Sequence, residues 1–176
     1  MAGLRQLLMG GDNSDFCASH YETHCSEEPQ HQRIVVRVLL PNGFPLQAVI
    51  DTASDWCILN PEIIEAIRDD AEYENEIKKG DKRKDRIEGD VIGIRIRGTP
   101  YQGQMARLTL TLPAEAGGSD QSYSIETTVF IPRLGSGERW LLPSFIGLNN
   151  FLNKIPWAID PDEELFFFGP VSDTHE

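Results

Sequence analysis

Residues 48–59 read AVIDTASDWCIL, an apolar run that is interrupted by the short polar segment 51–55. Residues 48–50 predict the end of a buried strand, and Asp51 follows directly. A carboxylate in that position costs free energy unless neighbouring groups satisfy it. Because small residues come next, the pattern indicates a tight loop that presents one carboxylate in a confined place. An ordinary turn or helix-capping Asp is the alternative interpretation of the same residues.

Strand and turn patterns surround this loop on both sides. Residues 34–40 and 46–50 predict two strands, joined by the hairpin turn PNGF at 41–44. Near the other end, SFIGLNNFL at 144–152 has two apolar residues, a Gly and then a predicted short helix with an apolar face. A closing hairpin is predicted from residues 157–160 and 164–169.

The middle of the chain predicts one short helix and a second hairpin. Asn60 is a good N-cap and Pro61 suits the first helical position, so residues 61–68 are expected to be helical. Residues 69–90 are mostly charged and predict a solvated insertion. Further strands are expected over residues 91–97, 101–112 and 123–131.

The order of these segments resembles that of the single-lobe, retroviral-type aspartic proteases, the retropepsin-like family, over residues 32–169. Residues 51–54 match the family's Asp-Thr/Ser-Gly-Ala/Ser/Thr loop, except that Ala53 stands where Gly is usual. The resemblance implies an all-β fold, a retropepsin-like closed antiparallel β-barrel with one or two short helices. Only one such Asp loop was found in the chain, so a symmetric homodimer is expected. We expect the terminal strands to pair across that dimer, because residues 166–168 (FFF) would otherwise expose an apolar edge.

By the same resemblance, the chain is expected to be an aspartic endopeptidase that cleaves peptide or protein substrates. Two Asp51 carboxylates, one per subunit, would share a proton and activate a water molecule. Thr52 is expected to hydrogen-bond across the dimer axis. The tip of the flap, the hairpin that folds over substrate, is expected within residues 93–103. The residues expected at the substrate are Ala53, Ser54, Asp55, Gly98, Tyr101, Ile146 and Gly147.

Three departures from the family pattern leave a second hypothesis open. Ala53 costs about 1 kcal/mol relative to Gly if its φ is positive and little otherwise. Leu148 stands where the retroviral enzymes have an Arg that pairs with the residue matching Asp55, so Asp55 needs another partner or stays solvated. The double-Gly flap tip is missing as well. The alternative is therefore a catalytically inactive, retropepsin-like dimerisation or peptide-binding module, and an unrelated β-barrel is the third possibility.

Composition limits the partners and the location. The 176 residues carry a net charge of −12, which disfavours a nucleic-acid interface. No apolar run is long enough for a transmembrane helix, and residues 1–11 do not match a secretory signal. Three cysteines are an odd number, so a cytoplasmic location is expected. The implied chemistry requires no cofactor and no metal.

The two ends of the chain are predicted to be flexible segments. Residues 1–31 predict a polar N-terminal extension, and 170–176 a C-terminal tail. The extension holds a group of possible zinc ligands, although a plain tail is the favoured interpretation. Its members are Cys17, His20, His24 and Cys25.

Overall fold

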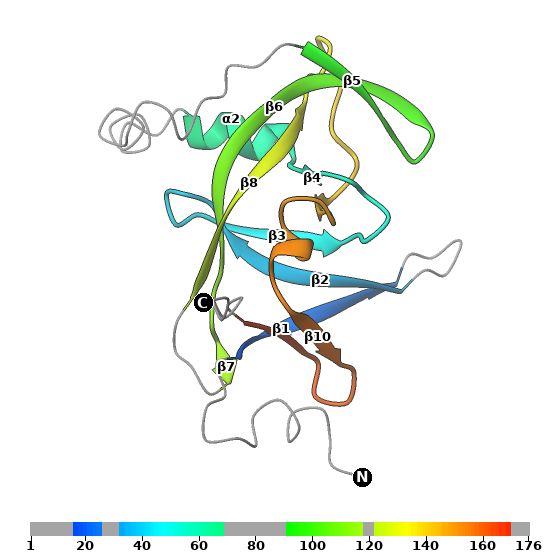
Figure 1. The fold of residues 1–176 in the computed structure, drawn as a ribbon. Coiled ribbons are helices and arrows are strands. Elements are labelled where there is room, and N and C mark those ends of the chain that lie inside the picture. Colours follow the sequence, from blue (N-terminus) through cyan, green and yellow to red (C-terminus); the bar gives the residue numbers. More distant parts are fainter. Residues whose placement is uncertain (1–15, 26–31, 69–90, 118–121, 170–176) are drawn as a thin grey trace.

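A computed structural model describes residues 16–25, 32–68, 91–117 and 122–169 (Figure 1). The chain is built almost entirely of strands, as expected for an all-β protein. In chain order the elements are β1 Cys17–Cys25, β2 Gln32–Leu39, β3 Pro45–Ile50, β4 Cys57–Ile58, α2 Pro61–Arg68, β5 Val91–Ile96, β6 Thr99–Leu112, β7 Ala116–Gly117, β8 Tyr123–Pro132, β9 Ser144–Ile146, the 3-10 turn Leu152–Lys154, β10 Trp157–Asp160 and β11 Leu165–Phe168.

The strands form one hydrogen-bonded sheet in the order β10-β11-β1-β2-β3-β9-β4-β8-β6-β5, with β7 beside β1. A single pair, Leu39 with Thr111, links β2 back to β6, so the pairings run in a circuit through β2, β3, β9, β4, β8 and β6. The expected antiparallel arrangement holds for most pairs. It is wrong for β3 with β9 and for β4 with β8, which pair in parallel.

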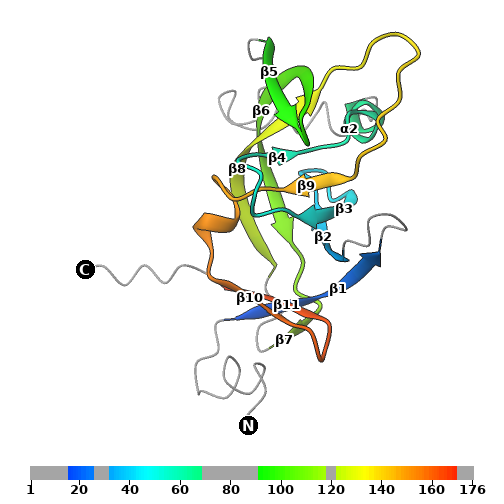
Figure 2. The same cartoon turned by 90° about the vertical axis from the view of Figure 1, so that its right-hand side faces the viewer.

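The long β6 and β8 strands bend through the whole height of the molecule (Figures 1 and 2). Their register runs from Gly103 opposite Pro132 to Leu112 opposite Tyr123. Alternate residues of β6 and β8 face the main core, which explains why the period-2 apolar pattern of this region predicted strands. Gly103 has no room for a side chain, because a Cβ there would overlap the Ile131 carbonyl oxygen and lie 2.5 Å from the Phe130 ring.

The two faces of the β2–β3 hairpin contribute to different apolar clusters. Val36, Val38 and Ala48 belong to the main core, whereas Val35 and Val49 belong to a second cluster. The second cluster also contains Ile96 of β5 and Phe145 of β9. We call the side of the sheet that carries this second cluster the flap face, because the β5–β6 hairpin packs on it.

The prediction that residues 1–31 form a flexible extension is wrong for residues 17–25, which form strand β1. The first half of this strand, residues 17–20, pairs with β11, and the second half, residues 21–25, pairs with β2. Ala18 and Ser19 are fully buried in it. The strand could not be recognised from the sequence because it buries small and polar residues on both faces. Its His and Glu residues also interrupt the apolar–polar alternation that indicates a strand. Residues 1–15, 26–31 and 170–176 lie outside the described part of the chain.

The four possible zinc ligands of the N-terminal extension all lie on strand β1. Cys17 is buried and His20 is exposed on β1. Among the residues that the structure describes, no group of three or more His, Cys, Asp or Glu side chains could hold a metal ion.

The position of strand β11 removes the reason for expecting the terminal strands to pair across a dimer, which was an exposed apolar edge at residues 166–168. It lies between β10 and β1 of the same chain, and Phe166, Phe167 and Phe168 are almost fully buried there. The apolar edge is therefore covered without a second subunit. The closing β10–β11 hairpin itself was predicted correctly.

Of the two helices expected from the sequence, one is present and the other is not. Helix α2 has the predicted bounds, and the Asn60 side chain accepts a hydrogen bond from the Glu62 backbone N–H at 2.9 Å. The helix expected after Gly147 is instead a series of turns with a 3-10 turn at 152–154, because Asn150 adopts a left-handed φ of 62°. The charged segment 69–90 lies outside the described residues. Within the described part, no helix is long and apolar enough to cross a membrane.

Candidate active site

The two sequence motifs that carry the predicted site meet at the ends of β3 and β9. These strands pair in parallel, with Ile50 opposite Ile146. Just beyond this pair, the Asp51 backbone N–H donates to the Ile146 carbonyl at 3.0 Å. The loop that follows β3 is thus attached at its first residue to the segment that contains Gly147.

The Asp51 loop is closed by its own hydrogen bonds. The Ser54 N–H donates to the Asp51 carbonyl at 3.1 Å, and the Ala53 N–H donates to the Asp51 carboxylate Oδ1 at 3.1 Å. The second bond holds one carboxylate oxygen in place. Asp51 is half-buried, whereas Thr52 and Ala53 are exposed. The loop therefore presents a fixed carboxylate at the surface of the single chain.

The segment after β9 fixes the second half of the loop. The Leu148 N–H donates to the Ser54 carbonyl at 2.8 Å, and the Asn149 N–H donates to the Asp55 carbonyl at 3.0 Å. Gly147 lies between these contacts. A Cβ at Gly147 would overlap the Trp56 carbonyl and lie 2.9 Å from the Ser54 oxygen, so only Gly fits. The Asp loop and the apolar-apolar-Gly motif are therefore held together by close backbone contact.

Ala53 lies in ordinary backbone conformation. Among the described non-glycine residues, positive φ values occur at Arg97, Asn150 and Glu164, and Ala53 is not one of them. Its methyl group therefore carries no left-handed penalty. The departure from Gly at this position adds a small side chain on the exposed side of the loop and leaves the loop conformation unstrained.

Asp55 has a partner that the sequence analysis did not identify. The Asn149 amide nitrogen donates to the Asp55 carboxylate at 3.3 Å, in addition to the backbone bond between the same two residues. Asn149 directly follows Leu148, the position where an Arg was absent. A neutral side chain one residue later therefore holds Asp55. The adjacent Asn residues at 149–150 are the sequence feature that could indicate this partner, although the pattern around them predicts a helix.

The remaining loop side chains are placed as follows. The Ser54 hydroxyl donates to the Trp56 carbonyl at 2.8 Å, so it stabilises the loop. The Thr52 hydroxyl has no hydrogen bond to any described residue. Thr52 is exposed and remains available to a second copy of the chain, which is the role expected for it.

The β5–β6 hairpin extends over the side of the molecule where the loop after β3 lies (Figure 1). Ile96 pairs with Thr99, so Arg97 and Gly98 form its two-residue tip. Their φ values are 51° and 84°, as a type I′ turn requires. Gly98 is thus at the tip, within the range 93–103 that was expected. Tyr101 lies farther back, where its ring meets Trp140 edge-on with centroids 5.2 Å apart.

The flap face connects this hairpin with the Asp51 loop. Ile96, next to the tip, is only 6% exposed and packs in the cluster that contains Val49 and Phe145. Val49 is two residues before Asp51 and Phe145 is two before Gly147. The structure therefore brings the tip of the hairpin and both motifs to one face, while Tyr101 remains behind the tip.

Comparison with known proteins gives matches at the level of fold. No family model and no curated protein matches the sequence. The chain is similar to a retropepsin-like aspartic protease from Rickettsia conorii, with 12% identity and a TM-score of 0.43 over 88% of this chain and 94% of that one. It is also similar to EIAV protease bound to the inhibitor HBY-793, with 15% identity and a TM-score of 0.36 over 71% of this chain and 88% of that one. The first of these belongs by its name to the family that the motifs resemble.

Proposed function

We propose that this protein is an aspartic endopeptidase in which two copies of the chain each supply one Asp51. The supporting observation is the loop of residues 51–55, which is tied to residues 146–149 by backbone hydrogen bonds and holds a half-buried carboxylate at the surface. A helix cap or a simple turn would not need this clamp to a segment nearly a hundred residues away. In this enzyme, residues 52–55, Gly98, Tyr101, Ile146 and Gly147 form the rest of the substrate site.

One Asp51 carboxylate supplies only half of the chemistry. Peptide hydrolysis needs a base that activates water and an acid that polarises the carbonyl oxygen. Two carboxylates a few ångströms apart provide both, because mutual repulsion keeps one of them protonated. The pair titrates as a unit, so either Asp51 can act as base or acid. The described residues contain one such loop, so the second carboxylate must come from a second copy.

The surface around the loop suits such an arrangement. Thr52 and Ala53 are exposed, and Leu148, joined to Ser54 by a backbone hydrogen bond, is 39% exposed. The patch thus combines an exposed leucine with a loop whose Thr52 hydroxyl has no hydrogen bond to a described residue, and association would cover such a surface. In the proposed dimer this patch lies on the two-fold axis, and the β5–β6 hairpins act as flaps over peptide or protein substrate.

The test is peptide-library cleavage by the purified protein between acidic and neutral pH, read by mass spectrometry, beside Asp51→Asn. Asn keeps the size and the hydrogen bond from Ala53 but cannot be ionised. We expect cleavage by the parent protein and a loss of at least about a hundredfold in the variant. Absence of cleavage by a parent protein that is dimeric in sedimentation would contradict the proposal and favour the inactive peptide-binding module.

A further inference from the structure

The tip of the β5–β6 hairpin carries an arginine in a conformation that disfavours it. Arg97 has a φ of 51°, and a non-glycine residue in that region costs about 1 kcal/mol or more. Asn or Gly is the usual choice at this position of a type I′ turn. A strained residue at the tip of a flap indicates that its side chain serves a purpose the turn alone does not need.

The guanidinium of Arg97 is directed onto the flap face. Its central carbon lies 5.4 Å from the centroid of the Phe145 ring, within cation–π distance. Phe145 is paired with Val49 and precedes the Ile146 carbonyl that binds the Asp51 N–H. The positive charge is therefore positioned over the strand ends from which the Asp51 loop begins.

Arg97 has no carboxylate partner among the described residues. The ion pairs there join Arg37 with Glu115 and Arg107 with Glu126, both elsewhere on the sheet. By contrast, Arg95, two residues earlier, donates to the Gly98 carbonyl and thereby supports the turn itself. The side chain of Arg97 is exposed, so a ligand can reach it.

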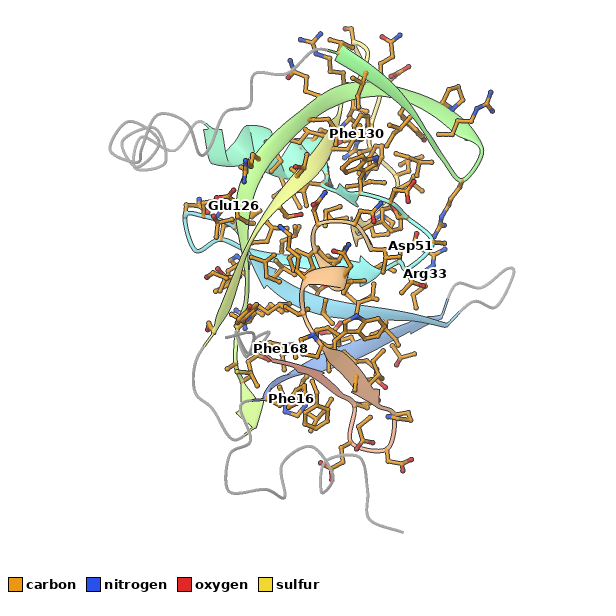
Figure 3. All side chains as sticks on the ribbon, in the orientation of Figure 1. Phe16, Arg33, Asp51, Glu126, Phe130 and Phe168 are labelled. Carbon is orange, nitrogen blue, oxygen red and sulfur yellow. The ribbon has the colours of Figure 1, made fainter. Side chains whose placement is uncertain are left out.

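A second arginine belongs to the same surface. In the β2–β3 hairpin, Val35 pairs with Val49, and this register, if continued, places Arg33 opposite Asp51. Directly opposite residues have side chains on the same face of a sheet, so Arg33 shares the flap face with Val35 and Val49. Figure 3 shows Arg33 and Asp51 at the same end of this hairpin. Like Arg97, Arg33 forms no ion pair with a described residue.

We propose that Arg97, supported by the charge of Arg33, gives the site a preference for peptides that carry an acidic side chain close to the scissile bond. A guanidinium can donate two parallel hydrogen bonds to a carboxylate. The neighbouring groups Val35, Val49, Ile96 and Phe145 are apolar, and such surroundings strengthen a charged hydrogen bond. The inference rests on the proposed function, because it names the substrate class of the same site.

Binding to the Asp51→Asn protein tests this preference without cleavage. The probes are apolar peptides in which one Glu is moved through every position, beside a matched set with Gln. At the best position we expect the Glu peptide to bind about tenfold more tightly, equivalent to about 1.4 kcal/mol. Adding Arg97→Asn should bring this ratio close to one while keeping the turn, since Asn suits a positive φ. Arg97→Lys should retain part of the ratio.

The matched control is Arg107→Gln on the same strand as the flap, which removes an equal charge far from the tip. A preference that survives Arg97→Asn, or that is lost equally in Arg107→Gln, would overturn the assignment. Equal binding of Glu and Gln peptides at every position by the starting protein would overturn it as well. Cleavage of the same peptides by the parent protein is measured in a separate experiment, so that the two proposals can fail independently. A parent that cleaves without acidic preference refutes only this inference, whereas a Glu preference without any cleavage refutes only the endopeptidase.

Discussion

Gly147 is the residue on which the close contact of the two site segments depends. A side chain there would collide with the backbone of Trp56 and Ser54, which belongs to the loop itself and cannot move without breaking its hydrogen bonds. Gly147→Ala should therefore lower the free energy of unfolding by about 2–3 kcal/mol, as overpacking does, and should displace the Asp51 loop. Urea denaturation measures the first effect and peptide cleavage the second.

Gly137→Ala is the matched control for that change. Gly137 has a φ of 81° but open space around its Cβ position, so the substitution adds only backbone strain, about 1 kcal/mol. Equal losses in the two variants would show that the Gly147 contact is looser than described.

Cys57 lies on β4 just after the Asp loop, and its thiol is expected to be unreactive. Burial raises the pKa of the Cys57 thiol from 9.0 to about 11, because the thiolate cannot be hydrated there. Below pH 9 the thiol is protonated in both folded and unfolded chains, so the stabilisation is fully present. Between pH 9 and 11 only the unfolded chain loses this proton, so the free energy of unfolding falls by about 1.4 kcal/mol per pH unit.

Urea titrations at several alkaline pH values measure this slope, and Cys57→Ala should remove the part that Cys57 contributes. In the folded protein at neutral pH, alkylation mapped by mass spectrometry should leave Cys57 unmodified. Rapid modification of Cys57 without denaturant would contradict the assignment.

At the scale of elements, β1 is the strand that completes the terminal part of the sheet within one chain. It separates β2 from β11 and covers the edge of the Phe-rich strand. Ala18, fully buried, packs with Leu165 and Phe167. Ala18→Lys would bury an unpaired charge and should cost roughly 3–5 kcal/mol or prevent folding. His20→Lys, on the same strand but exposed, is the control and should change the urea midpoint little. A folded, stable Ala18→Lys protein would mean that β1 is not an integral strand.

At the scale of the whole molecule, the proposed site exists only when two chains associate. Mixing equal amounts of parent and Asp51→Asn chains, followed by exchange, should reduce the activity per parent chain to about half, because mixed dimers contain one carboxylate. A dilution series of the parent should also lose specific activity as the dimer dissociates. Activity strictly proportional to the amount of parent chain in both experiments would show that one Asp51 suffices.

Much of the architecture was predictable because it is encoded in short-range patterns. Apolar runs predicted β2 and β3, alternation predicted β5 and β6, the PNGF turn predicted the first hairpin, and Asn60 with Pro61 predicted the start of α2. The order of the motifs predicted that Ile146 and Gly147 belong to the same site as the Asp loop. The helix after Gly147 was wrong because a single left-handed residue, Asn150, interrupts it, and no propensity rule places that φ.

The sequence alone determined which residues form the candidate site, since an Asp after an apolar strand and a Gly after another are local signals. Tertiary structure decided what surrounds them. Strand β1 pairs with β11, so the phenylalanine edge is covered within one chain. The Asn149 side chain donates a hydrogen bond to Asp55, and the guanidinium of Arg97 lies over the Phe145 ring. These contacts join residues far apart in the chain, and they depend on strand register and on the space left by neighbouring side chains, which no local pattern contains.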